Sequence, residues 1–335
     1  MSRRSRATDE ATGNLLDSLD PHLNQQVPES HTARPRCRHH RPRCIQQRGQ
    51  FPFGICYDIS MTAARFRKTI FSWYRVNGRH DLPWRKTRNP WRILVSEVML
   101  QQTQVPRVLI KYPLFIRRFP TARALARAPL RAVLAAWQGM GYNRRAVHLR
   151  ELARTLVREH DGNVPRNADE LSRLPGIGPN TAGAICAFAF DKHSVFVETN
   201  IRRVFLHHFF RRRQSVPDDA ILLAVSRTLP AGNYRAWYSA LMDYGALALK
   251  SRQNPNRRSA HFIKQSAFRG SQREVRGMII TALVRAGGAP EAALQNRVAS
   301  LLGRRYPAKE FSAIVSRMIQ EGVITKRNGR ITIPR

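Results

Sequence analysis

A glycine-rich turn between two apolar helices constrains this chain more than any other feature. The stretch "LSRLPGIGPNTAGAI" places Gly176 and Gly178 in one short turn, and glycine adopts backbone conformations that other residues avoid. The second helix is expected to begin near Pro179, because proline suits the first helical position. Free N–H groups at such a helix start can hold a phosphate without reading sequence. The turn therefore predicts a phosphate-binding site, with an ordinary turn between helices as the alternative.

The charge of the chain favours the same kind of partner. Lys and Arg number 58 against 22 Asp and Glu, which gives a formal net charge of +36 over 335 residues. Such an excess indicates a polyanion, and nucleic acid is the first candidate. Binding to a membrane surface would favour one basic amphipathic helix, whereas the arginines here are spread along the chain. No apolar run approaches the roughly 20 residues that span a bilayer, so no membrane partner is expected.

The length of 335 residues predicts about two to three domains. Residues 1–60 lack helical periodicity and are expected to be disordered, unless the protein begins at Met61 and the upstream stretch is an artefact. Residues 61–250 read as an all-α domain of many short helices, and 251–270 as a basic linker. Residues 271–335 are predicted to form three helices and a hairpin with Asn328-Gly329 at its turn. This arrangement suggests a winged-helix-like domain, which would either contact DNA or serve as a plain interaction module.

The cysteines predict neither a disulfide framework nor a metal site. Three of the four lie before Met61, and the fourth is Cys186 in an apolar helix, which fits a reducing cytosol. The stretch "CRHHRPRC", from Cys37 to Cys44, contains residue types that bind zinc. The arginines and proline between them favour coincidence, so no metal ion is expected.

Five segments carry a resemblance to a known family: "LPWRKTRNPWRILVSEVMLQQTQV", "WQGMGYNRRAVHL", "LPGIGPNTAGAI", "VETNIRRVF" and "ALMDYGAL". With their spacing, the chain from Met61 to Lys250 resembles the helix-hairpin-helix DNA glycosylases, and most of all the MutY-type adenine glycosylases. The resemblance implies a helix-hairpin-helix fold of two helical lobes. It also implies a cytoplasmic, nucleoid-associated monomer that acts on double-stranded DNA with a mismatched or damaged base.

The resemblance assigns two catalytic carboxyls. A glycosylase flips the base out of the duplex, and cleavage then needs an acid at the base and a carboxylate near the sugar. Glu97, in "ILVSEVML", matches the acid, and burial would raise its pKa; a surface glutamate is the alternative. Glu198 matches the sugar-side carboxylate, which is normally Asp followed by Gly-Asn, whereas this chain has Glu-Thr-Asn. A helix cap, or a partner for Arg202 or Arg203, is the alternative for Glu198.

Further positions match residues that bind the substrate or the DNA backbone. Trp84, Arg85 and Asp243 match the adenine pocket, with core packing, a phosphate contact and a helix salt bridge as their respective alternatives. Gln102 and Tyr142 match the wedge that fills the gap left by the flipped base, although turn packing also explains Tyr142. Gln101 and Asn180 are further predicted to bind substrate, and Gly176, Gly178 and Thr181 to bind phosphate.

Three departures from the family sharpen the expected function. Asn180 stands where bifunctional relatives have a lysine that forms a Schiff base, so the chain should not cut the strand. The four cysteines that commonly hold an iron–sulfur cluster after "MDYGA" are absent, so no cofactor is expected. The usual C-terminal domain for 8-oxoguanine is not evident either.

The sequence therefore predicts a monofunctional glycosylase that removes adenine mispaired with G or 8-oxoG. A thymine or uracil mismatch glycosylase, and an inactive damage-sensing DNA-binding protein, are the alternatives.

Overall fold

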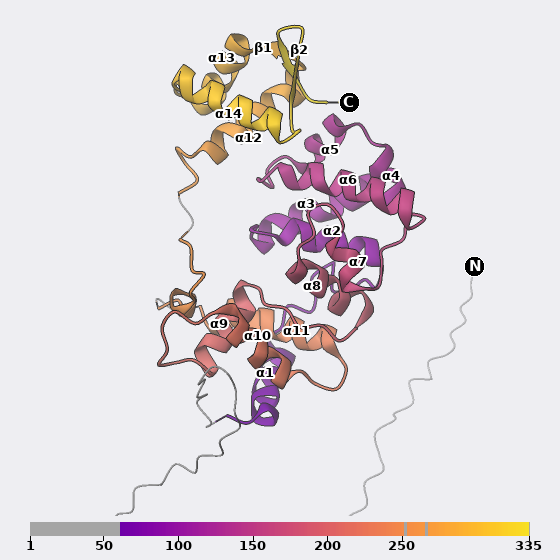
Figure 1. Cartoon of the computed structure of the whole chain (residues 1–335), viewed down its shortest axis with the longest axis vertical. Coiled ribbons are helices and arrows are strands. Elements are labelled where there is room, and N and C mark those ends of the chain that lie inside the picture. The colour runs from indigo at the N-terminus through magenta and orange to yellow at the C-terminus, as the bar shows by residue number, and fades with distance from the viewer. Residues whose placement is uncertain (1–60, 251–252, 265–266, 335) are drawn as a thin grey trace, which may run out of the picture. The chain divides into compact units, whose positions relative to one another are not determined.

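The computed structural model describes residues 61–250, 253–264 and 267–334, and helices dominate them (Figure 1). The expected all-α class is confirmed. The predictions for residues 1–60, including the stretch from Cys37 to Cys44, lie outside the described residues. Within the described part of the chain, no helix is long and apolar enough to cross a bilayer.

The helices of residues 61–250 form two groups. In the first group α2 packs against α8, and α4 packs against α6. It comprises α2 (Pro90–Leu100), α3 (Val105–Arg118), α4 (Ala122–Arg127), α5 (Leu130–Trp137), α6 (Arg144–Glu159), α7 (Ala168–Ser172) and α8 (Pro179–Phe190). The second group comprises α1 (Ala63–Asn77), α9 (Thr199–His208), α10 (Asp218–Thr228) and α11 (Tyr234–Asp243). Because α1 packs against α10 and α11, the first helix of the domain joins the group formed by the last ones.

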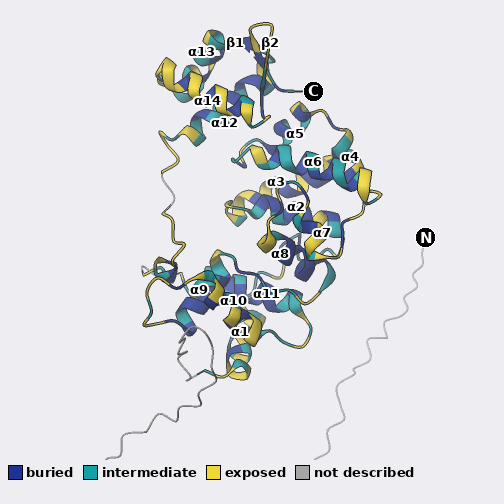
Figure 2. Cartoon of the chain, in the orientation of Figure 1, coloured by how far each residue is buried: buried dark blue, intermediate teal, exposed yellow. Residues whose placement is uncertain are grey.

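Helical spacing of apolar residues explains how each group buries its core. Helix α3, for example, buries Val108, Tyr112, Phe115 and Ile116, which recur on one face of the helix. The buried residues line the sides of the helices that face one another (Figure 2).

Aromatic side chains fix helix α9 within the second group. Phe66 of α1 makes edge contacts with Phe205 of α9 and Trp237 of α11, with ring centroids 5.4 and 5.7 Å apart. All three side chains are fully buried. Truncating a buried aromatic residue costs about 3–5 kcal/mol, so this cluster holds the orientation of α9.

The apolar stretch from Ser96 to Phe119 is divided by a turn. Helix α2 ends at Leu100, and α3 begins at Val105. Gln102 has φ +53°, a left-handed conformation that ends a helix, and Pro106 then occupies the first turn of α3. The turn carries Gln101 and Gln102, both predicted to contact substrate.

The glycine-rich turn joins α7 to α8 as predicted. Gly176 has φ +80°, and a Cβ atom there would lie 2.9 Å from the Cβ of His148, so a side chain would be both strained and obstructed. Gly178 is the N-cap of α8, which begins at Pro179. The position of this helix start is confirmed.

Two short helices follow α11. A π-helical turn, η1 (Tyr244–Ala248), continues from α11, and a 3-10 helix, η2 (Pro255–Arg258), lies in the stretch predicted to be a linker. Pro255 and Asn256 are buried, and η2 packs against α9. This part of the predicted linker is therefore integrated into the fold.

The C-terminal residues form three helices and a small sheet. They comprise α12 (Gln272–Ala286), β1 (Ala289–Pro290), α13 (Glu291–Leu302), α14 (Ala308–Gln320), β2 (Thr325–Arg327) and β3 (Arg330–Thr332). The sheet order is β1-β3-β2. Asn328 and Gly329, with φ +48° and +68°, form the two-residue turn between β2 and β3. The predicted hairpin is confirmed, whereas β1 is too short to be detected in the sequence. The winged-helix assignment stays a prediction.

Candidate active site

The charge of one carboxyl group, Glu198, acts on a second, Glu97, which lies on a separate helix. Glu97 lies on α2 among buried neighbours that include Val95, Val98 and Met99. Burial first and the charge of Glu198 second raise the pKa of Glu97 to about 8, against the opposing charge of Arg85. Glu198 is therefore close enough for its charge to act on Glu97. A carboxyl group with this pKa keeps its proton near neutral pH and can act as a general acid.

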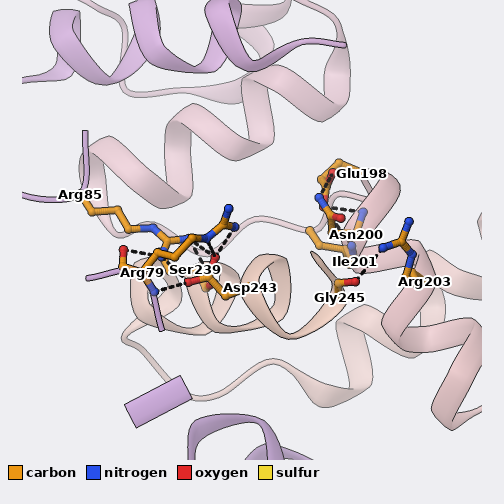
Figure 3. Close-up of polar contacts among 9 residues, drawn as sticks. All are labelled: Arg79, Arg85, Glu198, Asn200, Ile201, Arg203, Ser239, Asp243 and Gly245. Carbon is orange, nitrogen blue, oxygen red and sulfur yellow. Dashed lines mark hydrogen bonds and ion pairs between the residues drawn. The ribbon is translucent and has the colours of Figure 1, made fainter. Parts of the chain in front are cut away.

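Backbone N–H groups fix the second carboxyl, Glu198, at the start of α9. Its Oε1 atom accepts hydrogen bonds from the N–H groups of Asn200 at 2.7 Å and Ile201 at 2.9 Å (Figure 3). The side-chain amide of Asn200 donates to Oε2 at 3.3 Å. Burial raises the pKa of Glu198, and the two backbone hydrogen bonds oppose that rise. Because the N-terminus of a helix favours negative charge, this position suits a carboxylate.

The structure distinguishes between the two alternatives for Glu198. It is the N-cap of α9, as one alternative proposed. The salt-bridge alternative is not found: Arg202 pairs with Asp218 at 2.7 Å, and Arg203 donates to the carbonyl of Gly245 at 2.9 Å. Among the described residues, no ion pair involves Glu198. Capping occupies one oxygen with strong hydrogen bonds and leaves the other with one longer contact, so it is compatible with a catalytic carboxylate.

The three predicted pocket residues make mainly structural contacts. Asp243 is fully buried and forms ion pairs with Arg85 at 2.6 Å and Arg79 at 2.5 Å (Figure 3). Burial acts to raise the pKa of Asp243, but hydrogen bonds from Arg85 and Arg79 outweigh it, so the pKa is lowered. Trp84 is buried, with its ring centroid 5.5 Å from that of Tyr112. The charge of Arg85 nevertheless acts on Glu97 and lowers the pKa of that carboxyl. Contact of these residues with adenine stays a prediction.

Four predicted contact residues line one groove. They are Gln101, Gln102, Tyr142 and Thr181. The side-chain amide of Gln101 donates to the hydroxyl of Thr181 at 3.2 Å, which joins the turn after α2 to the start of α8. Gln102 and Tyr142, the two predicted wedge residues, both have positive φ, at +53° and +48°. Strained backbone in residues other than glycine tends to gather at functional sites, so both wedge positions share a geometry consistent with that role.

Arg145 connects the two wedge turns and was missed in the sequence. Its guanidinium group donates to carbonyl groups at the end of α2 and in the turn before α6. The acceptors are Val98 O at 2.8 Å, Met99 O at 2.9 Å, Gln101 O at 2.6 Å, Met140 O at 3.2 Å and Gly141 O at 3.2 Å. Burial lowers the pKa of Arg145 to about 10. The available signal was the pair Arg144 and Arg145 at a helix start, where positive charge is disfavoured.

The hairpin helix is also tied to the segment that carries Glu198. Asn180 accepts a hydrogen bond from the N–H group of Val197 at 3.1 Å. The first N–H groups of α8, next to Gly178 and Thr181, have no acceptor within the helix, as a phosphate-binding site requires. The hairpin that would bind the DNA backbone is thus linked directly to the segment that leads into Glu198 and α9.

The described residues around this site do not fit an iron–sulfur cluster. Cys186 is their one cysteine, and it is buried in α8. No group of three or more His, Cys, Asp or Glu residues in the described part of the chain could hold a metal ion. The sequence after α11 has no cysteine up to its end, and thiolates are what hold such clusters.

Comparisons with known proteins agree with this geometry. Residues 95–224 match the family described as "HhH-GPD superfamily base excision DNA repair protein". An adenine DNA glycosylase of Mycobacterium tuberculosis is 35% identical over 295 residues, which cover 79% of this chain and 92% of that protein. One from Buchnera aphidicola is 37% identical over 198 residues, 58% of this chain and 56% of that protein, so the match spans about half of the latter. The solved structure of a thermostable thymine-DNA glycosylase is similar with a TM-score of 0.51 and 28% identity, and the match covers 58% of this chain and 90% of that one.

Proposed function

This chain belongs to the adenine DNA glycosylase family within the HhH-GPD superfamily of base excision repair proteins, and from that premise we propose that it hydrolyses the N-glycosidic bond of a flipped-out, mispaired adenine. One observation carries the proposal. The pKa of Glu97 is raised to about 8 by burial and by the charge of a second carboxyl, Glu198, which the start of α9 holds. Two carboxyls with different environments are what an acid and a charge-stabilising group require.

The two carboxyls divide the reaction between them. Glu97 donates its proton to the adenine ring, and the electron pair of the N-glycosidic bond leaves with the base. Positive charge then develops on the sugar, and the Glu198 carboxylate stabilises it and orients a water molecule. The oxygen of the water forms a bond to the sugar carbon, and a proton of the water passes to one of the two carboxylates. Free adenine and an abasic site are the products.

The reaction stops at the abasic site in this proposal. Asn180 has no amine with which to form an imine with the sugar, and the oxygen of its side-chain amide accepts a hydrogen bond from the N–H group of Val197. The proposed enzyme is also free of an iron–sulfur cluster. Iron and acid-labile sulfide assays on anaerobically purified protein should find neither in stoichiometric amount, and about four iron atoms per chain would contradict this part.

The proposed partner is double-stranded DNA with a mismatched base. The protein is proposed to act on it as a monomer. The formal net charge of +36 supports DNA as the partner, because neutralised phosphates supply much of the affinity of DNA-binding proteins. The start of α8 would hold one phosphate through its free N–H groups. With this substrate, the proposed place of action is the cytoplasm, at the nucleoid.

Excess protein incubated with duplexes that contain A:8-oxoG, A:G, T:G or U:G tests the proposal. Strand cutting that appears with the adenine mispairs, and only after alkali, is the expected result. Cutting without alkali would contradict the monofunctional assignment. Product from T:G or U:G alone would support a different base specificity, which the resemblance to a thymine-DNA glycosylase makes worth testing. Tight binding with no product would indicate a damage-sensing protein.

A further inference from the structure

Residues 254–260 follow α11, in the stretch where the resemblance described above would place cluster-binding cysteines that this chain lacks, and they contact α9 near both of its ends. We propose that Asn256 and Arg258 of this segment are positioning residues that hold α9, and with it Glu198, in place of a metal cluster. The catalytic consequence rests on the proposed function. The contacts themselves do not depend on it.

Asn256 holds the N-terminal end of α9. It is 5% exposed, and its side-chain amide donates to the carbonyl of Thr199 at 3.1 Å. Thr199 directly follows Glu198 and is the first residue of α9. Asn254 supports this geometry, because its side chain accepts a hydrogen bond from the N–H group of Asn256 at 3.2 Å. A buried amide thus fixes the peptide unit adjacent to the candidate catalytic carboxylate.

Arg258 holds the C-terminal end of the same helix. Its guanidinium group donates to Leu206 O at 2.8 Å and Phe210 O at 2.7 Å, and also to the carbonyl of Arg211. The last carbonyl groups of a helix lack partners within it, and a cation there also complements the helix dipole. The guanidinium group meets both requirements, so one short segment secures both ends of a ten-residue helix.

The 254–260 segment is itself anchored to the chain that follows α9. The N–H group of Val216 donates to the carbonyl of Arg258 at 2.8 Å, and that of Ala260 donates to the carbonyl of Val216 at 2.9 Å. Because backbone hydrogen bonds on both sides flank Ser259, the segment cannot slide along α9 without breaking them.

The η1 turn also contacts α9, including its first turn. Arg203 donates to the carbonyl of Gly245 at 2.9 Å (Figure 3). A Cβ atom at Gly245 would lie 2.3 Å from the carbonyl oxygen of Asn200, which shows how closely the two backbones approach. Asn200 and Ile201 supply the N–H groups that hold Glu198. Any shift of this turn therefore moves the carboxylate.

A matched set of variants in the full-length protein tests the positioning role. Asn256→Ala removes one hydrogen bond without changing charge. Arg258→Ala removes the hydrogen bonds to the carbonyl groups at the C-terminal end of α9. Arg257→Ala is the control, since Arg257 lies in the same 3-10 helix but is exposed. Single-turnover kinetics on an A:8-oxoG duplex separate the rate constant of excision from the amplitude, which reports the fraction of active protein.

We expect the excision rate constant of Asn256→Ala and Arg258→Ala to fall at least about tenfold, since a misplacement of about 1 Å costs roughly a hundredfold. Arg257→Ala should keep the wild-type rate constant, and Arg258→Lys should recover part of the loss. An unchanged rate constant with a lower amplitude would mean that the segment only stabilises the fold, and would overturn the proposal. Asn256→Ala decides the question if Arg258→Ala fails to fold.

Hydrogen exchange gives a readout that does not require excision. The amides of Asn200 and Ile201 should exchange faster in Asn256→Ala than in wild type, while those of α6 remain unchanged. Equal exchange rates in α9 would overturn the proposal. If the wild-type protein excises no base from any duplex, the proposed function fails while this measurement still decides whether the segment holds α9.

Discussion

The two candidate catalytic regions, the middle of α2 and the start of α9, use the same amino acid in opposite ways. On α2 the causes that raise the pKa of Glu97 to about 8 are burial and a neighbouring negative charge. At the start of α9 two backbone N–H groups oppose the effect of burial on Glu198. Burial raises the pKa of both carboxyls, and the difference teaches that hydrogen-bond donors, more than residue type, favour the charged form of Glu198.

Removing the charge of Glu198 is expected to cause the largest loss of excision rate. Glu198→Gln keeps the size of the side chain but cannot balance positive charge on the sugar. We expect a loss at the upper end of the roughly 10²–10⁴-fold range for such groups, measured as the single-turnover rate on an A:8-oxoG duplex. Glu159→Gln, which changes an exposed glutamate on α6, should keep the wild-type rate. A Glu198→Gln rate within threefold of wild type would reject the assignment.

Changing Glu97 should give the next largest effect and a defined pH dependence. Because Glu97 must be protonated to act, the excision rate of the wild-type protein should fall as pH rises through about 8. Glu97→Gln should lose roughly 10²–10³-fold in rate at neutral pH, and its residual activity should lack that limb. A wild-type profile that stays flat from pH 6 to pH 9 would contradict the role of Glu97.

The same substitution should stabilise the fold at high pH. The pKa of Glu97 is raised from 4.5 in the reference state to about 8 in the folded protein, so the folded state binds the proton more tightly than the unfolded chain. The wild-type free energy of unfolding therefore decreases as pH rises between these values. The Tm of Glu97→Gln minus that of wild type should grow over this window, and a difference that shrinks with pH would be inconsistent with burial as the cause.

Gly245→Ala should perturb the α9 side of the comparison directly, and the α2 side only through the charge of Glu198. The added Cβ would meet the carbonyl of Asn200 at 2.3 Å, so the first turn of α9 must move. We expect a loss of about 1–3 kcal/mol in the free energy of unfolding and a slower excision rate. The pKa that governs the basic limb should also shift, since Glu198 acts on Glu97. Gly178→Ala, where the added atom meets nothing within 4 Å, is the matched control for stability.

Arg145→Lys should have the smallest effect on chemistry, because it acts on the wedge turns and on neither carboxyl. A lysine cannot reach the several carbonyl groups that the guanidinium group joins. We expect weaker base flipping, seen as reduced fluorescence of a 2-aminopurine placed at the target position, with the pH profile retained. An altered pH profile would show that the wedge turns and the carboxyls are coupled.

Local features of the site could be predicted from the sequence, whereas its long-range contacts could not. Glycine and proline chemistry placed the start of α8, and Asn328-Gly329 placed the hairpin. The contact between Asn256 and Thr199 joins residues 57 positions apart, and that between Arg85 and Asp243 joins residues 158 apart. Such pairs depend on how α9 and α11 pack, and no local pattern encodes that packing. The same limit explains why the role of Arg145 was missed.

The cap formed by Glu198 has an evolutionary consequence. Losing Glu97 removes a carboxyl whose ionised form burial disfavours, which stabilises the protein at the higher pH where Glu97 ionises, so drift towards stability acts against the acid there, as is common for catalytic groups. Losing Glu198, for example to alanine, instead removes two backbone hydrogen bonds at a helix start, at a cost of about 0.5–2 kcal/mol. Selection for a folded protein therefore also preserves this carboxylate, even in a lineage where repair is under weak selection.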